Sequence, residues 1–288
     1  MASLRDIPRR INSVKNTRKI TRAMKLVAAA KMRKAQVAAQ SAQPYQQSLQ
    51  TVLGRVVAAE DSIEHPLLAV PSNKLNVVLI ALTSDRGLCG SFNSKLIKHT
   101  IQLAKKYQAE GKDVQIIAYG RKIVAAMKSE GLDLLHEDSG LKPEQFADKA
   151  QELSKMLVSM LEEDRFEKVL LCYNEFINVM TQEAMNKQVL PMDLSDVQDE
   201  QSANADYIYE PGGTEILAEL LPLNLRAQLL QAFLDTEAGE QAARMQAMEN
   251  ATKNAGEMID RLSLEYNRAR QAAITTELTE IISGAEAL

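Results

Sequence analysis

Both ends of the chain carry an apolar stripe at helical spacing over a length that few globular domains contain. Residues 1–57 and residues 214–283 place apolar side chains three and four positions apart. At a rise of 1.5 Å per residue, the two ends would form helices about 75 Å and about 90 Å long. Neither helix can bury its stripe alone, so the sequence predicts that the two ends pair as an antiparallel coiled coil.

The pattern also predicts which side chains lie in the interface between the two helices, and it predicts that Pro44 and Pro222 kink or interrupt them. In the first helix, we expect the interface to hold Ile7, Ile11, Val14, Ile20, Met24, Val27, Ala35, Ala38, Ala42, Tyr45, Leu49, Val52 and Val56. In the second helix, we expect it to hold Leu223, Ala238, Ala242, Met245, Met248, Ala255, Ile259, Leu262, Tyr266, Ala269, Ala273 and Ile281.

The middle of the chain follows a different pattern. Continuous apolar runs predict buried strands, and helical patterns separate them, which is typical of an α/β sheet. We expect strands at 74–83, 114–118, 168–173, 181–190 and 207–209, and helices at 91–108, 121–129 and 143–161. The predicted fold class is α/β with long helices: an antiparallel coiled coil of the terminal helices plus an inserted Rossmann-like α/β domain. The predicted domains are 1–57, 74–211 and 212–288.

Charge is distributed unevenly along the chain. The net charge is −4, yet residues 1–40 carry eleven Lys and Arg and one acid, Asp6. One interpretation is a solvated helix face; another is a surface for an acidic partner, either a protein or a nucleic acid. A basic helical-hairpin protein that binds nucleic acid is therefore the alternative function. The two cysteines, Cys89 and Cys172, are far apart and form no metal-binding pattern.

The loop 84–90 (SDRGLCG) follows the first predicted strand and precedes a helix, where phosphate-binding loops lie. It has neither a GxGxxG spacing nor a Gly-Lys-Ser/Thr ending, so a tight turn is the simpler interpretation. The three histidines are scattered, and no catalytic constellation is present in the sequence. No run of 18 apolar residues occurs either. We therefore expect a non-catalytic protein without cofactor or metal.

Three strings carry a family resemblance over the whole chain. They are RINSVKNTRKITRAMKLVAAAKMRKAQ near the start, SDRGLCGSFN in the middle, and RMQAMENATKNAGEMI with YNRARQAAITTELTEIISGA near the end. Together they resemble the gamma subunits of bacterial-type rotary ATP synthases. The resemblance implies a central rotor shaft that couples proton-driven rotation of the c-subunit ring to the conformational cycle of the catalytic beta subunits. Catalysis would then take place in the beta subunits and not in this chain.

The resemblance also implies partners and contact residues. The expected partners are the alpha and beta subunits of a hexamer, the epsilon subunit and the c ring. No nucleic acid is expected, and contact with the membrane would be indirect, at the cytoplasmic face of the bacterial inner membrane. By motif, Met24 and Arg244 resemble positions that face the beta lever, and Arg270 and Gln271 resemble those that contact a beta catch loop. Also by motif, Glu280 lies in a segment implicated in coupling, and Tyr207 and Glu210 resemble the foot on the c ring.

Overall fold

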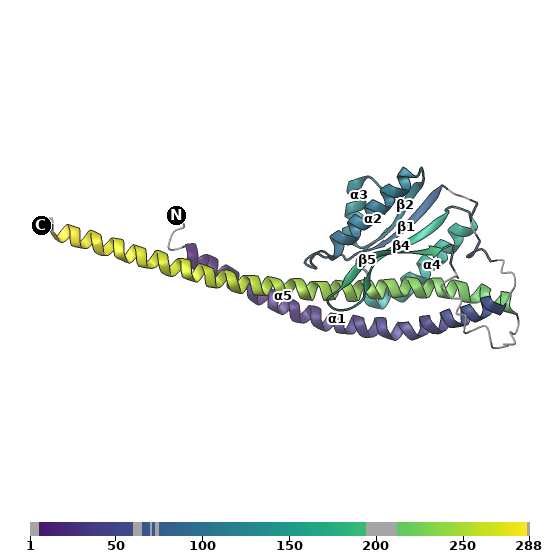
Figure 1. Cartoon of the computed structure of the whole chain (residues 1–288), viewed down its shortest axis with the longest axis horizontal. Helices are drawn as coiled ribbons and strands as arrows, with labels where there is room; N and C mark the ends of the chain where they lie inside the picture. Colours follow the sequence, from purple (N-terminus) through teal and green to yellow (C-terminus); the bar gives the residue numbers. More distant parts are fainter. Residues whose placement is uncertain (1–5, 60–64, 70, 73–74, 194–211, 287–288) are drawn as a thin grey trace. The chain divides into compact units, whose positions relative to one another are not determined.

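The structure is a computed structural model that describes residues 6–59, 65–69, 71–72, 75–193 and 212–286. The chain forms two compact units. The first unit combines the chain up to Ala29 with the chain from Arg244 onward, and the second unit is Ala30–Ala243. Helices α1 (Asp6–Ala59) and α5 (Gly213–Glu286) each contribute to both units (Figure 1).

In the first unit, α1 and α5 pack side by side in opposite directions. The Thr21 and Thr252 hydroxyls are 2.8 Å apart, and one turn further along α1 the Lys25 Nζ lies 2.7 Å from Glu249 Oε1. The residue number in α5 decreases as the residue number in α1 increases, so the two helices are antiparallel. This confirms the predicted coiled-coil arrangement.

The interface of α1 follows a stricter repeat than the one predicted. Buried or half-buried side chains recur every seven residues from the start of the helix to its end. These positions are Ile7, Val14, Thr21, Ala28, Ala35, Ala42, Leu49 and Val56. A period of seven keeps one face of a helix against its partner along the whole length of a coiled coil.

Several interface residues predicted in α1 were wrong. Ile20 and Val27 are 60% and 56% exposed, because the neighbouring Thr21 and Ala28 occupy the interface instead. Ala38, Tyr45 and Val52 are exposed in the same way. The prediction followed the larger apolar side chains, whereas the packed face uses small side chains that let two helix backbones approach closely.

The predictions for α5 hold best in its middle. Ala238, Ala242, Met248, Ala255, Ile259 and Leu262 are buried as predicted, and Ile11 and Met24 of α1 are half-buried. Met245, Tyr266, Ala269 and Ala273 are half-buried too. Leu223 and Ile281 are exposed, so their assignment to the interface was wrong. For Ile281 the reason is length: extending the register by heptads places Ile7 opposite about Tyr266, and α5 continues 20 residues beyond that.

Neither proline breaks its helix, so the predicted interruptions were wrong, whereas the predicted kink at Pro44 stays a prediction. Pro44 lies inside α1 and Pro222 lies inside α5, and both helices are continuous. A proline inside a helix costs about 3 kcal/mol, because it removes one backbone hydrogen bond and crowds the preceding turn. Packed side chains flank both sites, including Ala39 and Leu49 in α1 and Leu221 and Leu225 in α5. Burial of these side chains offsets the loss, since packing supplies most of the stability of helices in proteins.

The second unit contains a five-stranded sheet in the order β3-β2-β1-β4-β5. Strands β1 to β4 are parallel and β5 is antiparallel to β4. The strands are β1 (Asn76–Leu82), β2 (Asp113–Tyr119), β3 (Asp133–Asp138), β4 (Lys168–Phe176) and β5 (Gln182–Leu190). Four of them match predicted strands. The sequence did not predict β3, whose DLLHED sequence is charged and half-buried at the sheet edge, and the strand expected at 207–209 lies outside the described residues.

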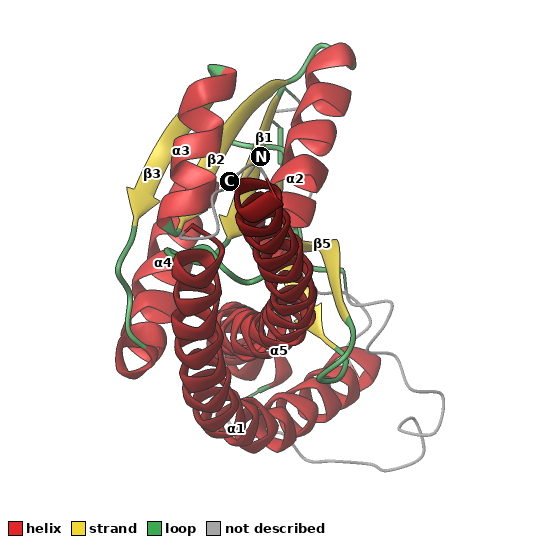
Figure 2. Ribbon diagram, turned by 90° about the vertical axis from the view of Figure 1, so that its left-hand side faces the viewer, coloured by secondary structure: helices red, strands yellow, loops and turns green. Residues whose placement is uncertain are grey.

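Helices cover both faces of this sheet. On one face, α2 (Phe92–Ala109) and α3 (Arg121–Glu130) pack on side chains such as Val77 and Leu79 (Figure 2). On the other face lie α4 (Phe146–Glu162), preceded by a 3₁₀ turn at Pro143–Gln145, and parts of both long helices. Leu53 of α1 and Leu221 of α5 belong to that core. The inserted domain is thus Rossmann-like, as predicted, and the long helices are part of its hydrophobic core.

Candidate functional site

The paired helices of the first unit form a groove lined mainly by cations. Its walls carry Arg18, Lys19, Arg22 and Lys25 from α1, and Lys253 from α5. One acid, Glu249, also lines the groove and pairs with Lys25. An exposed pair of this kind adds about 0–1 kcal/mol, so its main effect is on local charge and not on stability. The groove therefore presents a positive surface suited to an acidic partner.

Small and hydroxyl side chains bring the two helices together beneath this groove. The Thr252 hydroxyl lies 2.7 Å from the Met248 carbonyl oxygen, and the Thr21 hydroxyl lies 3.2 Å from the Arg18 carbonyl oxygen. A Cβ added at Gly256 would lie 4.0 Å from an Arg18 guanidinium nitrogen, which is ordinary contact. The predicted interface did not include Thr21 or Thr252. The one sequence signal for Thr21 is that it follows Ile7 and Val14 at a spacing of seven residues.

The structure places the predicted beta-contact residues in two groups. Met24 and Arg244 are half-buried and lie where α1 and α5 run alongside each other. Arg270, Gln271 and Glu280 are exposed and lie on the part of α5 that continues past the register position of Ile7. The predicted foot residues, Tyr207 and Glu210, lie outside the described residues.

The final turns of α5 form a surface of opposite character to the groove. Ile274, Leu278, Ile281 and Ile282 are all at least half-exposed, and no Lys or Arg follows Arg270. Exposed apolar side chains of this number are typical of a surface that a partner covers. The first unit thus combines a basic groove with an apolar, mildly acidic end.

The loop 84–90 is a structural turn between β1 and α2. Its conformation requires a positive φ at Leu88 and at Gly90. The Asp85 carboxylate accepts hydrogen bonds from the backbone N–H of Arg121 at 3.0 Å and of Gly140 at 2.8 Å. A carboxylate of the chain itself therefore already occupies the positive end of α3, where a phosphate would otherwise be stabilised.

No group of three or more His, Cys, Asp or Glu side chains in the described ranges is arranged to hold a metal ion. Of the helices that the structure describes, none contains an apolar window long enough to cross a bilayer. Both cysteines are buried thiols, and burial raises the pKa of Cys172 to about 12.

Comparison with known proteins assigns the family. The family model described as ATP synthase matches residues 3–288. The ATP synthase gamma chain of Pelotomaculum thermopropionicum is 43% identical over 288 residues, and that of Rhizobium rhizogenes is 44% identical over 294 residues; both matches cover 100% of each chain.

Solved structures show the same fold. A chain of the Euglena gracilis mitochondrial ATP synthase, solved as OSCP/F1/c-ring, matches with a TM-score of 0.64 and 20% identity, covering 99% of this chain and 94% of that one. A chain of the Tetrahymena thermophila central stalk/c-ring matches with a TM-score of 0.56 and 23% identity, covering 81% and 99%. With the full-length relatives, these matches show that the chain belongs to the family of ATP synthase gamma chains, the non-catalytic central-stalk rotor subunits of the F-type enzyme.

Proposed function

We propose that this chain transmits rotation between a c-subunit ring and a hexamer of alpha and beta subunits, with α1 and α5 as the shaft. The observation that carries the proposal is the continuity of the two long helices together with their antiparallel packing in the first unit. The Euglena match comes from an OSCP/F1/c-ring assembly, and the Tetrahymena match comes from a central stalk/c-ring assembly. These assemblies support equivalent partners for this chain.

The coupling mechanism follows from the asymmetry of the paired helices. A partner changes its state only if its contacts differ between states. The first unit presents a basic groove around Arg22 and, outside the groove, exposed apolar side chains such as Val27 and Ile274. A rotating shaft would bring these surfaces in turn to three identical beta subunits. Each beta subunit would then meet a different contact set at each angle.

We assign the contacts with beta to the residues predicted by motif. Met24 and Arg244 would face an acidic lever, next to the basic groove that attracts it. Arg270 and Gln271 would hydrogen-bond a catch loop, and Glu280 would lie in the bearing formed by the end of α5. The apolar side chains of that end make no directional bond that would hold one angle, which suits a bearing.

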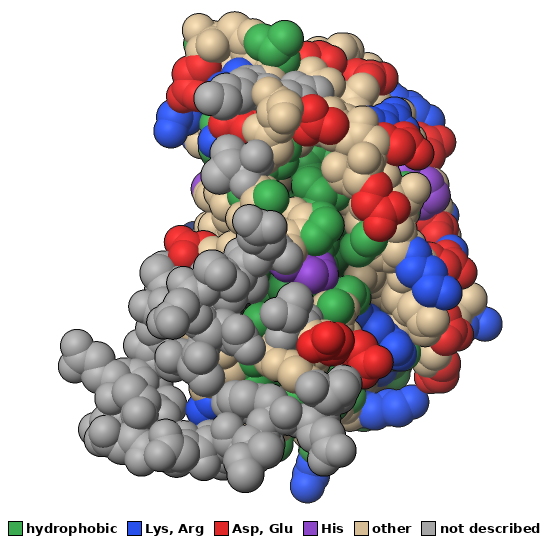
Figure 3. Space-filling view, turned by 90° about the vertical axis from the view of Figure 1, so that its right-hand side faces the viewer, with side chains coloured by type: hydrophobic (Ala, Val, Ile, Leu, Met, Phe, Trp, Pro, Cys, Tyr) green, Lys and Arg blue, Asp and Glu red, His purple; other side chains and the backbone are tan. Residues whose placement is uncertain are grey.

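The foot of the shaft would be the end of the second unit where α1 ends and α5 begins. On that face, hydrophobic side chains are exposed between scattered acidic and basic ones (Figure 3). We propose that Tyr207 and Glu210 contact the c ring and that epsilon binds beside them. The chain would then be peripheral, at the cytoplasmic face of a bacterial inner membrane. We propose that the predicted domains 1–57 and 212–288 supply the two helices of this shaft and that the predicted domain 74–211 is its inserted body.

A nucleic-acid partner would also satisfy the charge of the groove. The match to gamma chains over the whole length of the protein supports an acidic protein partner instead.

The test is a charge substitution at Met24 in the assembled complex. Met24→Lys adds a cation beside Lys25 and Arg22, so we expect it to bind the acidic lever too strongly and to lower ATP-driven proton pumping per ATP hydrolysed. The control is Met24→Leu, which keeps volume and polarity and should pump normally. Equal pumping by Met24→Lys and wild type at matched hydrolysis would remove Met24 from the contact.

The foot has its own test. Glu210→Lys should lower the amount of complex that assembles on the c ring, because it reverses one charge at the proposed contact. The control is Glu183→Lys, which makes the same charge change at an exposed position at the start of β5, at the opposite end of that strand from Leu190. If Glu210→Lys and wild type assemble and pump alike, Glu210 is not part of the foot.

A further inference from the structure

Within the second unit, the ring of Phe92 packs into a notch in the surface of α5. The floor of the notch is Gly239: a Cβ added there would lie 3.0 Å from Phe92 Cε2 and 3.4 Å from Gln182 Cγ. Glycine in the middle of a helix is destabilising relative to alanine, because it gives up more backbone freedom on folding. At Gly239 the missing side chain leaves the room that the Phe92 ring occupies.

Buried side chains of α5 surround this notch. Residues three and four positions apart are neighbours on a helix surface, so the walls of the notch are Asp235, Thr236, Ala242 and Ala243. Each of the four is at most 9% exposed, and Ala243 shares a small hydrophobic cluster with Phe92 and Cys89. A ring seated between such walls opposes rotation of α5 about its own axis, because turning the helix would drive one wall into the ring.

Hydrogen bonds hold Phe92 in place at the start of α2. Its backbone N–H donates to the Cys89 carbonyl oxygen at 3.2 Å, and its carbonyl oxygen accepts from Asn174 Nδ2 at 3.4 Å. Asn174 is 2% exposed and belongs to β4, so the sheet itself positions the ring. The second neighbour of the notch, Gln182, is held too, because its Nε2 donates to two carbonyl oxygens of the turn between β4 and β5.

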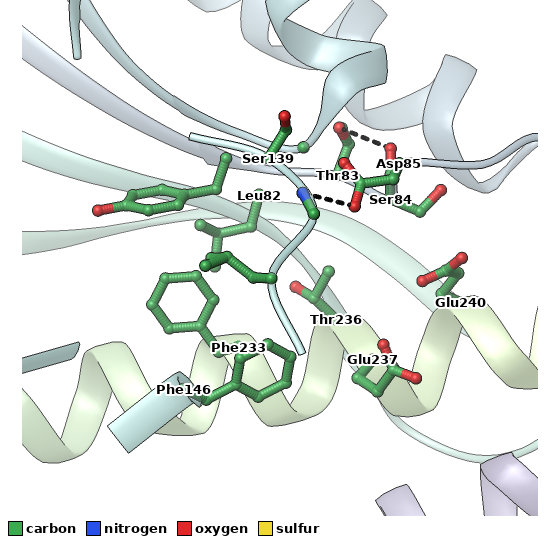
Figure 4. A pocket seen from close by; sticks show the side chains of 14 residues that line it. Leu82, Thr83, Ser84, Asp85, Ser139, Phe146, Phe233, Thr236, Glu237 and Glu240 are labelled. Carbon is green, nitrogen blue, oxygen red and sulfur yellow. Dashed lines mark hydrogen bonds between the residues drawn. The ribbon is translucent and has the colours of Figure 1, made fainter. Parts of the chain in front are cut away.

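The notch lies beyond the main core of the second unit along α5. That core includes Phe233, whose ring stacks on Phe146 with the centroids 5.5 Å apart (Figure 4). Among the described residues, the main core reaches α5 as far as Leu234. The second unit itself ends at Ala243. Phe92 therefore contacts α5 close to the point where the helix leaves the α/β domain.

We infer that Phe92 is a positioning residue of the rotor: its ring, seated at Gly239, fixes the angle of α5 relative to the α/β domain and passes torque between them. The inference rests on the proposed function, because torque acts on this contact only if the chain rotates. Without the ring, the nearest hold on α5 would be the main core at Leu234. The free part of α5 before the proposed beta contact at Arg244 would then lengthen from five residues to ten.

The first test measures torsional stiffness in the assembled complex, which is fixed through its hexamer and carries a gold nanorod on Lys95→Cys of α2. With ATP removed, the variance of the nanorod angle is inversely proportional to the stiffness between hexamer and label. A longer free helix twists more easily, and α1 shares the load, so Phe92→Ala should raise this variance about 1.5-fold or more.

The matched control is Leu96→Ala. It truncates a fully buried side chain of the same helix, which packs on the sheet face that α2 and α3 cover, and it should leave the variance unchanged. Equal variance in Phe92→Ala and Leu96→Ala would overturn the inference. A wild-type label that does not turn during ATP hydrolysis would instead overturn the proposed function, and this inference with it.

The second test moves the large side chain from α2 to α5. Gly239→Val fills the notch and displaces the ring, so it should raise the angular variance as Phe92→Ala does. In Phe92→Ala/Gly239→Val the larger side chain stands on α5, and the total side-chain volume is nearly conserved. This double variant should recover at least half of the stiffness that either single variant loses. A double variant with a larger variance than both single variants would overturn the inference.

Hydrogen exchange of the full-length chain tests the contact without the motor. In Phe92→Ala, the backbone amides of residues 235–243 should exchange at least tenfold faster than in wild type, because α5 is no longer held there. The amides of residues 221–229, which the main core holds, should stay within twofold of wild type. Unchanged exchange at residues 235–243 would show that the ring does not hold α5 and would overturn the inference, whether or not the variant assembles into a complex.

Discussion

At the scale of single residues, the most unusual group is a buried acid in α5. Asp235 is buried, and desolvation raises its pKa from 3.8 to about 6, although the hydrogen bond from Gln231 Nε2 at 2.9 Å opposes the shift. The nearby charge of Glu175 raises the pKa further. A folded-state pKa above the unfolded value means that ionisation of this acid disfavours the folded state.

Asp235 makes the free energy of unfolding depend on pH. Below pH 3.8 Asp235 is protonated in both states, and as the pH rises from 3.8 to about 6 the unfolded chain loses its proton first. The free energy of unfolding should therefore fall across this window and then level off, by about 3 kcal/mol for two pKa units. Asp235→Asn should remove that fall and stabilise the chain at pH 7 by about 1–3 kcal/mol. Urea unfolding at several pH values measures both effects.

The matched control for this prediction is Glu219→Gln, which neutralises an exposed acid on the same helix. It should leave the pH dependence between pH 4 and pH 6 unchanged. If Asp235→Asn and wild type lose stability in parallel over that window, Asp235 is not the group responsible.

At the scale of secondary-structure elements, the sequence predicted which helices and strands form better than it predicted which of their side chains pack together. Apolar spacing predicted both long helices and four of the five strands. The phase of α1 was missed because Ile20 and Val27 are larger than Thr21 and Ala28, which are the residues that pack. The hydrophobic pattern of a sequence reflects how apolar each side chain is. Close packing of two helices depends instead on how small the side chains are. β3 was missed because its half-buried edge position needs no continuous apolar run.

The candidate contact surfaces were less accessible to sequence reasoning than the fold. The charge of residues 1–40 predicted a basic surface, and the structure shows that part of it lines a groove with Lys253. A cavity at the carboxyl end of the sheet, lined in part by Tyr119, Phe146 and Thr236, gave no sequence signal, because its walls come from β1, β2, the loops after β1 and β3, α4 and α5. Only the tertiary fold brings these segments together.

The register of α1 and α5 predicts one specific cross-link. The Thr21→Cys/Thr252→Cys variant should form a disulfide under mild oxidation, because the two hydroxyls it replaces are 2.8 Å apart. The control is Arg22→Cys/Thr252→Cys, which turns the first thiol by about 100° around the helix. Native Cys89 and Cys172 are buried and should not interfere. Faster cross-linking of the control pair than of the test pair would mean a different register.

Substitutions in α5 should change the free energy of unfolding by different amounts along the helix. Ile259 is 7% exposed and Ile281 is 70% exposed on the same helix. Ile259→Ala should lower the free energy of unfolding by about 2–4 kcal/mol through lost burial and a cavity. Ile281→Ala should change it by less than about 0.5 kcal/mol. Equal losses from the two substitutions would show that the end of α5 is packed against another part of the chain.

At the scale of the whole molecule, the two units of this rotor subunit differ in how the long helices are packed. In the first unit, α1 pairs with α5, the last turns of α5 continue beyond the paired region, and the exposed surface is chemically asymmetric. In the second unit, both long helices belong to the hydrophobic core of the α/β domain. Torque applied to that domain would therefore act on α1 and α5 through buried contacts and not through a flexible linker.

The most direct test of the shaft is single-molecule rotation of the assembled complex, fixed to a surface through its hexamer and labelled on this chain at Lys95→Cys, an exposed position in α2. The same complex also carries Thr21→Cys/Thr252→Cys, observed reduced and oxidised. During ATP hydrolysis the label should rotate in one direction in both states, because the disulfide lies within the shaft. Continued hydrolysis with a stationary label, or rotation that stops only when the disulfide forms, would contradict a shaft in which α1 and α5 turn together.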